Sequence, residues 1–182
     1  MSPYTIRRAV PGDAAGLVAL AREVGGEPEG WLISTDEWRG VGDERRYLRA
    51  TRRSSHAAVF VAESVDGLVG RLSVARDPHP ASFHVADLGL MVAASHRRQG
   101  IGRALLEAAV AWAGQVGVTK LELHVFPHND AAIATFHAFG DRLIREFAFE
   151  LGLPPDVRVL SRPETVVFRE SSPATTRSER RG

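Results

Sequence analysis

The sequence predicts an α/β fold in which one mixed sheet is flanked by helices. Three observations support this. Apolar, β-branched stretches of strand length recur along the chain, two of them are joined by a hairpin turn, and segments of helical periodicity separate the later ones. An early hairpin followed by strand, helix, strand and helix predicts a sheet with both antiparallel and parallel pairs. The length of 182 residues suits a single domain with a real core.

In the first third of the chain, residues 4–10 alternate in polarity and predict an opening strand. A turn over residues 11–13 then leads into a helix over residues 13–24, with Asp13 as its N-cap and two glycines after it. A second helix is predicted over residues 36–52, although Gly40 and Gly42 weaken its first turns.

The middle of the chain predicts a β-hairpin and a strand–helix unit. Residues 57–64 and 68–75 are β-rich and are joined by Asp66-Gly67, a strong hairpin dipeptide. After a proline-containing break, residues 83–92 predict the next strand. Residues 100–116 carry apolar side chains near helical spacing and predict a helix.

The last part of the chain predicts a strand over residues 119–126 and a helix over residues 129–139. Further strands are expected over residues 143–151 and 165–169. Residues 171–182 are Ser, Thr, Arg, Glu and Pro with little else, so we expect a disordered tail after a domain of residues 1–170.

Composition excludes several classes of site. The chain has no cysteine, which removes disulfides, thiolate zinc sites and cysteine nucleophiles. No apolar run approaches the roughly 20 residues of a membrane span, and charged residues interrupt any signal-peptide pattern near the N-terminus. A net charge of +1 argues against general nucleic-acid binding. We therefore expect a cytoplasmic protein that binds neither nucleic acid nor membrane and, since no third ligand accompanies His124 and His128, no metal site.

A basic, glycine-bearing turn links the predicted strand over residues 83–92 to the helix that follows. Its sequence is Arg97-Arg98-Gln99-Gly100-Ile101-Gly102-Arg103. Main-chain N–H groups at a helix start, with the helix dipole, favour a phosphate, and glycines let a ligand approach them. A Walker loop is absent, and Leu105 stands where a Rossmann fingerprint needs its third glycine. By itself the turn indicates either a pyrophosphate cradle or a solvated loop.

A second motif lies downstream, where an apolar strand runs through Pro127 to Asn129, with Ala132 and Phe136 on the helix that Asn129 opens. Together and in this order, the two motifs resemble the GNAT superfamily of N-acyltransferases over roughly residues 4–169. The resemblance implies a central mixed sheet that splays between its fourth and fifth strands. It also implies acetyl-CoA as co-substrate.

The resemblance also assigns cofactor contacts. It implies that the main chain of Leu90, Met91 and Val92 pairs with the pantetheine arm, and that a backbone N–H near Val92 holds the developing oxyanion. The basic turn, from Arg97 to Arg103, corresponds to the pyrophosphate cradle. Asn129 corresponds to an asparagine that binds the arm, although a plain N-cap role fits asparagine equally. Ala132 and Phe136 share its helix face and are expected to flank the thioester.

The residues that would act as general acid and general base are less well defined. Many relatives carry tyrosine where Phe136 stands, and phenylalanine has no proton to give to the leaving thiolate. His124 stands where some relatives have a glutamate base, and an imidazole suits that role near neutral pH. Glu122 shares its strand face, and Asp87 on the preceding strand is a further candidate. A sheet-bonded histidine and solvated strand carboxylates are the structural alternatives.

For the acceptor, the resemblance points to the connection between the first two helices, where Glu29 and Trp31 suit a cationic amine. A solvated acidic rim explains the same residues. The function expected is an N-acetyltransferase that transfers acetyl from acetyl-CoA to an amine of a small molecule or peptide by direct attack. An acyl-CoA sensor and a protein N-terminal acetyltransferase are the alternatives, and a homodimer is left open.

Overall fold

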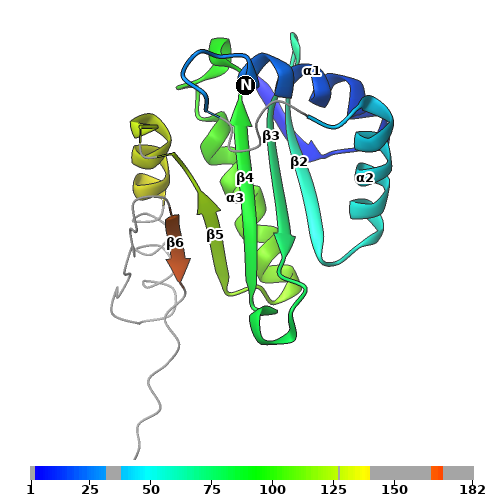
Figure 1. Ribbon diagram of the computed structural model, residues 1–182, viewed down its shortest axis with the longest axis vertical. Coiled ribbons are helices and arrows are strands. Elements are labelled where there is room, and N and C mark those ends of the chain that lie inside the picture. The colour runs from blue at the N-terminus through cyan, green and yellow to red at the C-terminus, as the bar shows by residue number, and fades with distance from the viewer. Residues whose placement is uncertain (1–2, 32–37, 127, 140–164, 170–182) are drawn as a thin grey trace, which may run out of the picture.

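The computed structural model describes residues 3–31, 38–126, 128–139 and 165–169, the last of these through their backbone only. Six strands form one sheet in the order β1-β2-β3-β4-β5-β6 (Figure 1). All neighbours are antiparallel except β4 and β5, which are parallel. The mixed sheet predicted from the sequence is therefore confirmed.

The strands are β1 (Tyr4–Arg8), β2 (Ala57–Ser64), β3 (Gly67–Arg76), β4 (Val85–Val92), β5 (Lys120–His124) and β6 (Thr165–Arg169). The helices are α1 (Ala14–Gly25), α2 (Val41–Arg53) and α3 (Ile101–Val116), with an additional helix over residues 130–139. Short 3₁₀ turns lie at Pro11–Asp13, Pro80–Ser82 and Ala94–His96.

Most predicted boundaries agree with these to within a few residues. The clearest difference is α2, which begins at Val41 rather than at residue 36, because Gly40 is extended and serves as the N-cap. The strand β4 begins at Val85, since residues 83 and 84 still belong to the turn after Ser82. The predicted strand over residues 143–151 and the tail over residues 171–182 lie outside the described residues.

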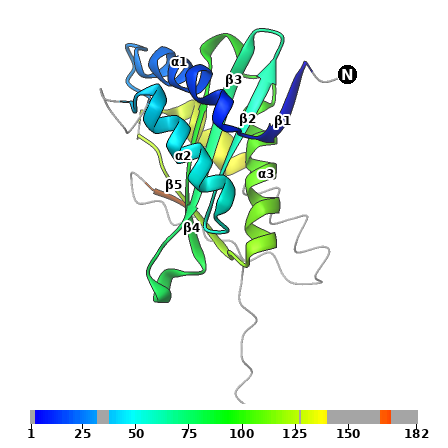
Figure 2. The same cartoon turned by 90° about the vertical axis from the view of Figure 1, so that its right-hand side faces the viewer.

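Helices cover the two faces of the sheet separately (Figure 2). The helix α3 packs on β2, β3 and β4 from one side, whereas α1 packs on β3 and β4 and α2 on β2 from the other. The larger core cluster includes Leu72, Leu105 and Trp112 on the α3 side and extends to Leu20 and Val24 of α1. A smaller cluster under α1 and α2 is built around Leu17 and Leu48. Two buried layers thus fix the sheet between the helices.

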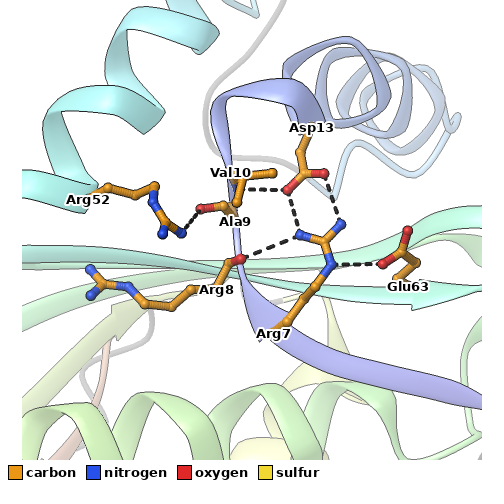
Figure 3. A network of polar contacts seen from close by, with 7 residues as sticks. All are labelled: Arg7, Arg8, Ala9, Val10, Asp13, Arg52 and Glu63. Carbon is orange, nitrogen blue, oxygen red and sulfur yellow. Dashed lines mark hydrogen bonds and ion pairs between the residues drawn. The ribbon is translucent and has the colours of Figure 1, made fainter.

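Charged groups hold the corner where β1 passes into α1 (Figure 3). Arg7 donates to both carboxylate oxygens of Asp13, at 2.8 and 2.9 Å, and to Glu63 on β2 at 2.7 Å. Asp13 also accepts the main-chain N–H of Val10 at 2.7 Å. Arg52 on α2 donates to the carbonyl of Ala9 at 3.2 Å. The corner therefore connects β1, α1, α2 and β2 through hydrogen bonds that leave neither Arg7 nor Asp13 unpaired.

The parallel pair β4–β5 is short. Its register runs only from Val85 opposite Lys120 to Leu88 opposite Leu123, although β4 continues to Val92. Beyond this point the two strands diverge, as the tilted arrow of β5 shows (Figure 1). The last four residues of β4 thus keep β3 on one side and have no strand partner among the described residues on the other, which is the expected splay.

Candidate functional site

The first turn of α3 has main-chain donors that the described part of the chain does not use. The first helical bond runs from the N–H of Ala104 to the carbonyl of Gly100, at 3.0 Å. The N–H groups of Ile101, Gly102 and Arg103 precede it, and no acceptor among the described residues takes them. Such donors, with the helix dipole behind them, form an anion site.

The backbone before this turn is shaped by two left-handed residues. Gly100 has φ of +82°, and Arg98 has φ of +61°, the one positive value for a non-glycine among the described residues. Glycine adopts this conformation freely, whereas arginine pays a conformational cost on the order of 1 kcal/mol there. Gly102 differs: a Cβ there would meet only Leu90 at an ordinary 3.6 Å. Packing within the protein does not require glycine at 102, and its small size leaves room for a ligand to approach the neighbouring N–H groups.

The arginines of the turn have different surroundings. Arg97 forms a two-pronged ion pair with Glu27, at 2.5 and 2.7 Å, and donates through Nε to the carbonyl of Val92 at 3.1 Å. Its guanidinium is thus occupied within the protein and ties the end of α1 to the end of β4, a role that the sequence did not indicate. The side chain of Arg98 has no partner among the described residues, and Arg103 pairs with exposed Glu107 at 3.0 Å. Of the expected cofactor arginines, Arg98 and Arg103 are the accessible ones.

The open edge of β4 presents alternate main-chain groups. Ala93 donates to Val69 at 2.9 Å, so residues with its parity, such as Met91, bond to β3. By the alternation of an antiparallel ladder, Leu90 and Val92 direct their N–H and C=O groups away from β3, toward the splay. The Val92 carbonyl is taken by Arg97. Both groups of Leu90 and the N–H of Val92 remain to pair with an extended ligand.

Asn129 acts as an N-cap in the structure. Its Oδ1 accepts the N–H of Ala132 at 3.1 Å, and its carbonyl accepts the N–H of Ile133 at 3.0 Å. The side-chain NH₂ has no partner among the described residues, so it keeps two donors for a ligand. Ala132 is half-buried, whereas Phe136 is only 6% exposed and belongs to the main core. Phe136 therefore supports the helix from within.

The three candidate bases lie together on the sheet. Asp87 is opposite Glu122 in the β4–β5 register, and His124 follows two residues later on the same face. Glu122 forms an ion pair with Lys120. Burial by the neighbouring strands is the main cause that raises the pKa of Asp87, and the charge of Glu122 adds to it while His124 opposes it. His124 is exposed, and its side chain makes no hydrogen bond with the described residues.

The predicted acceptor residues lie beside the loop that precedes Asn129. Trp31 stacks on His128 with ring centres 5.7 Å apart, and His128 stacks on Phe126 at 5.3 Å. The Nε2 atom of His128 lies 3.0 Å from the carbonyl oxygen of Glu29. The carboxylate of Glu29 is exposed. The sequence named Trp31 and Glu29 but did not indicate that His128 anchors them.

Among the described residues, no group of three or more metal-ligating side chains lies close enough to hold an ion. No helix in this part of the chain combines the length and the apolar character needed to cross a bilayer.

The sequence and the fold of this chain are similar to those of known proteins. A model of the acetyltransferase (GNAT) family matches residues 19–141. A crystal structure of a GNAT-family acetyltransferase from Streptococcus pneumoniae is similar, with a TM-score of 0.70, 26% identity, and coverage of 75% of this chain and 83% of that one. The structure of yncA from Salmonella typhimurium with its cofactor acetyl-CoA has a TM-score of 0.67 at 21% identity, covering 76% and 79%. That second likeness concerns the fold alone.

Among curated proteins, N-acetyltransferase family 8 member 3 from Rattus norvegicus is 29% identical over 127 residues. The match covers 65% of this chain and 56% of the rat protein, so the chain spans about half the length of that relative.

Proposed function

The chain belongs to the acetyltransferase (GNAT) family, and from this premise we propose that it transfers an acetyl group from acetyl-CoA to a primary amine of a small molecule or peptide. One observation carries the proposal. Unused main-chain donors at the start of α3 and unused main-chain groups at Leu90 and Val92 lie at the two ends of one loop. A pyrophosphate joined to an extended amide-bearing arm matches both.

In the proposed reaction the amine nitrogen attacks the carbonyl carbon of the thioester. A C–N bond forms, the C–S bond breaks, and CoA leaves as a thiolate that takes up a proton. The attacking nitrogen loses one proton to a base or to water. A thiol of pKa about 8.5 is a fair leaving group near neutral pH, so the reaction tolerates Phe136 in place of an acid.

The chain's own residues have separate roles in this proposal. The N–H groups of residues 101–103 bind the pyrophosphate, and the N–H of Val92 faces the thioester oxygen. The NH₂ of Asn129 bonds the arm. Of the three candidate bases, we assign the role to His124, because Glu122 is paired with Lys120 and because an imidazole suits proton transfer near neutral pH.

Replacing Gly102 by alanine tests the cofactor site. The protein has room for the methyl group, and alanine is about 1 kcal/mol more favourable than glycine within a helix, so the melting temperature should hold or rise. A methyl between the N–H groups and the phosphates should raise the Kd for acetyl-CoA at least about tenfold in calorimetry, a change of about 1.4 kcal/mol.

Gly114→Ala is the matched control, because that glycine lies in the same helix with no atom near its Cβ position. It should stabilise the helix similarly and leave the Kd unchanged. Millimolar or weaker binding by the wild type, or equal Kd values for all three proteins, would count against a cofactor site at this turn.

A non-catalytic acyl-CoA sensor is the second candidate, and the absence of a hydroxyl at Phe136 favours it. Release of the CoA thiol with a panel of amines separates the two, since a sensor gives none beyond slow hydrolysis. A protein N-terminal acetyltransferase is separated by including a peptide with a free N-terminus in the same panel.

A further inference from the structure

The face of the sheet that bears α1 and α2 includes an arginine that the sequence analysis did not single out. A Cβ at Gly70 would lie 2.9 Å from Ile101 of α3, so Gly70 faces α3 and its neighbour Arg71 faces the opposite way. Arg71 is paired in register with Met91, and Gly89 and Asp87 follow on the same face of β4. Arg71 therefore lies on the same sheet face as the candidate bases, one strand away from the open edge of β4.

The charge of Arg71 is buried and incompletely paired. The residue is 6% exposed, and its one ionic partner is Glu44 of α2, 0% exposed, at 3.5 Å. The Nε of Arg71, the indole Nε1 of Trp38 and the Oε2 of Glu44 are buried and have no hydrogen-bond partner among the described residues. The guanidinium lies over the Trp38 ring at 4.9 Å, so the two unused donors belong to groups in contact. Buried donors without acceptors are costly, which indicates that something else satisfies them.

The charges around this pair favour an anion. Arg39 lies 3.9 Å from the second oxygen of Glu44, so two arginines share one carboxylate. Tyr47 is the other titratable group that acts on Arg71. Burial is the main cause that lowers the pKa of Arg71, and the charge of Glu44 acts in the opposite direction. A second carboxylate would balance the second arginine and supply the missing acceptors.

Next to this cluster the sheet surface is bare. Gly89 is exposed, and a Cβ there would make only ordinary contact with the hydroxyl of Ser73, at 3.5 Å. Packing in the protein therefore does not require glycine, and a glycine inside a strand weakens it. The missing side chain leaves space on β4 between Met91, which is level with Arg71, and Asp87, which is level with Glu122.

We propose that the acceptor carries a carboxylate as well as its amine, and that Arg71 and the indole N–H of Trp38 hold the carboxylate while the amine lies over Gly89. Two residues along a strand span about 7 Å, so the amine and the carboxylate are separated by only a few bonds. The amine is then beside Leu90 and Val92, where the thioester is proposed to bind. The assignment rests on the proposed acetyl transfer and specifies its substrate class as a small amino acid.

Matched acceptors test this directly. Leucine, methionine, phenylalanine and 4-aminobutyrate are each compared with their carboxamides and with the amines left by removing the carboxylate, using release of the CoA thiol from acetyl-CoA. At least one acid should exceed both of its analogues in kcat/KM by about tenfold or more. The carboxamides also represent a peptide N-terminus, so a preference for them overturns the proposal in favour of a peptide acceptor. Equal use of acid, amide and amine overturns it as well.

Two variants address the assigned residues. Arg71→Met should abolish the preference for the acid and leave the Kd for acetyl-CoA within about twofold, whereas a purely structural arginine would change all acceptors alike. Gly89→Val leaves the buried pair intact and should raise KM for the acid at least about fivefold without lowering the melting temperature. If the acid preference survives in both variants, Arg71 does not bind the acceptor.

The acceptor panel also distinguishes a failure of this inference from a failure of the proposed acetyl transfer. If spermidine or a peptide is acetylated and none of the acids is, the inference alone fails. If no amine in the panel releases CoA thiol, the proposed acetyl transfer fails and the inference with it.

Discussion

Two regions of this molecule treat their polar groups in opposite ways. At the corner in Figure 3, every charge finds a partner within the chain: Arg7 is bound by Asp13 and Glu63, and Asp13 also takes the N–H of Val10. Around the splay of β4 and β5, main-chain donors of α3, the Nε of Arg71 and the indole N–H of Trp38 have no partner among the described residues. The first region stabilises the fold, whereas the second has unused bonding capacity that we propose a ligand takes up.

Two aspartates make the contrast measurable. Burial alone would raise the pKa of Asp13, but hydrogen bonds from Arg7 and Val10 outweigh it and lower the pKa below its ordinary value. At Asp87 burial also raises the pKa, and the negative charge of Glu122 raises it further, so that the pKa lies above its ordinary value. By linkage, the charged form of Asp13 stabilises the fold and that of Asp87 destabilises it. The comparison shows that the pKa of an aspartate falls where cations and N–H groups surround it and rises where it lies partly buried beside another carboxylate.

The largest expected effect is at the corner. Replacing Asp13 by alanine leaves Arg7 and the Val10 N–H without their main partner, which should lower the free energy of unfolding by about 2–3 kcal/mol. Chemical denaturation at pH 7 measures this loss. Asp43→Ala is the control, since Asp43 pairs only with Arg46 on an exposed surface and should cost less than about 1 kcal/mol.

The same variant has a definite pH dependence. Because the folded pKa of Asp13 lies below the unfolded one, its stabilisation is complete above about pH 4 and disappears as the pH falls through the folded value. The difference in the free energy of unfolding between wild type and Asp13→Ala should therefore shrink below about pH 4. A difference that stays constant down to pH 2 would show that the stabilisation does not depend on the charge of Asp13.

The next largest effect is expected on catalysis, from a substitution at His124. His124→Ala should lower kcat/KM about 100-fold if the imidazole acts as the base, and should flatten the rise of kcat/KM with pH. The melting temperature should change little, because His124 is exposed and its side chain makes no hydrogen bond with the described residues. Unchanged activity and an unchanged pH profile would assign His124 to the structure of the strand.

The arginines of the basic turn give a smaller effect. Arg97→Met removes the ion pair with Glu27 and the bond to the Val92 carbonyl, and should cost about 1–2 kcal/mol of stability. It should leave the salt dependence of acetyl-CoA binding almost unchanged, whereas Arg98→Met should reduce it. Calorimetric titrations at several NaCl concentrations measure both, and a reduced salt dependence for Arg97→Met would return Arg97 to the cofactor site.

The smallest effect is expected at the second aspartate. Asp87→Asn removes a charge whose folded pKa is raised, so it should stabilise the protein at pH 7. Much of the Asp87 side chain is exposed, so solvent screens its charge. The gain in the free energy of unfolding should therefore be below about 0.5 kcal/mol. The gain should shrink as the pH falls and vanish well below pH 4, where the wild-type carboxyl is protonated in both states. A loss of stability at pH 7 would contradict the contrast with Asp13.

Local chemistry made much of this fold predictable. The Asp66-Gly67 turn predicted the β2–β3 hairpin, and the helical spacing after Gly100 predicted α3. The start of α2 was misplaced because the apolar and acidic residues before Gly40 fit a helical pattern, and a single sequence does not show that the extended Gly40 caps the helix. For Arg71, a charged residue within the apolar run of β3 was a visible signal that was not used.

The sequence by itself determined the order of strands and helices and the presence of main-chain N–H donors at the basic turn, because both depend on residues close together in the chain. Only the tertiary structure decided the partners of Arg97 and Arg71, since Glu27 and Glu44 are brought to them by the packing of α1 and α2 on the sheet. It also placed Phe136 in the core and Gly89 on an exposed face. Such assignments depend on contacts between distant segments, which spacing along the chain does not specify.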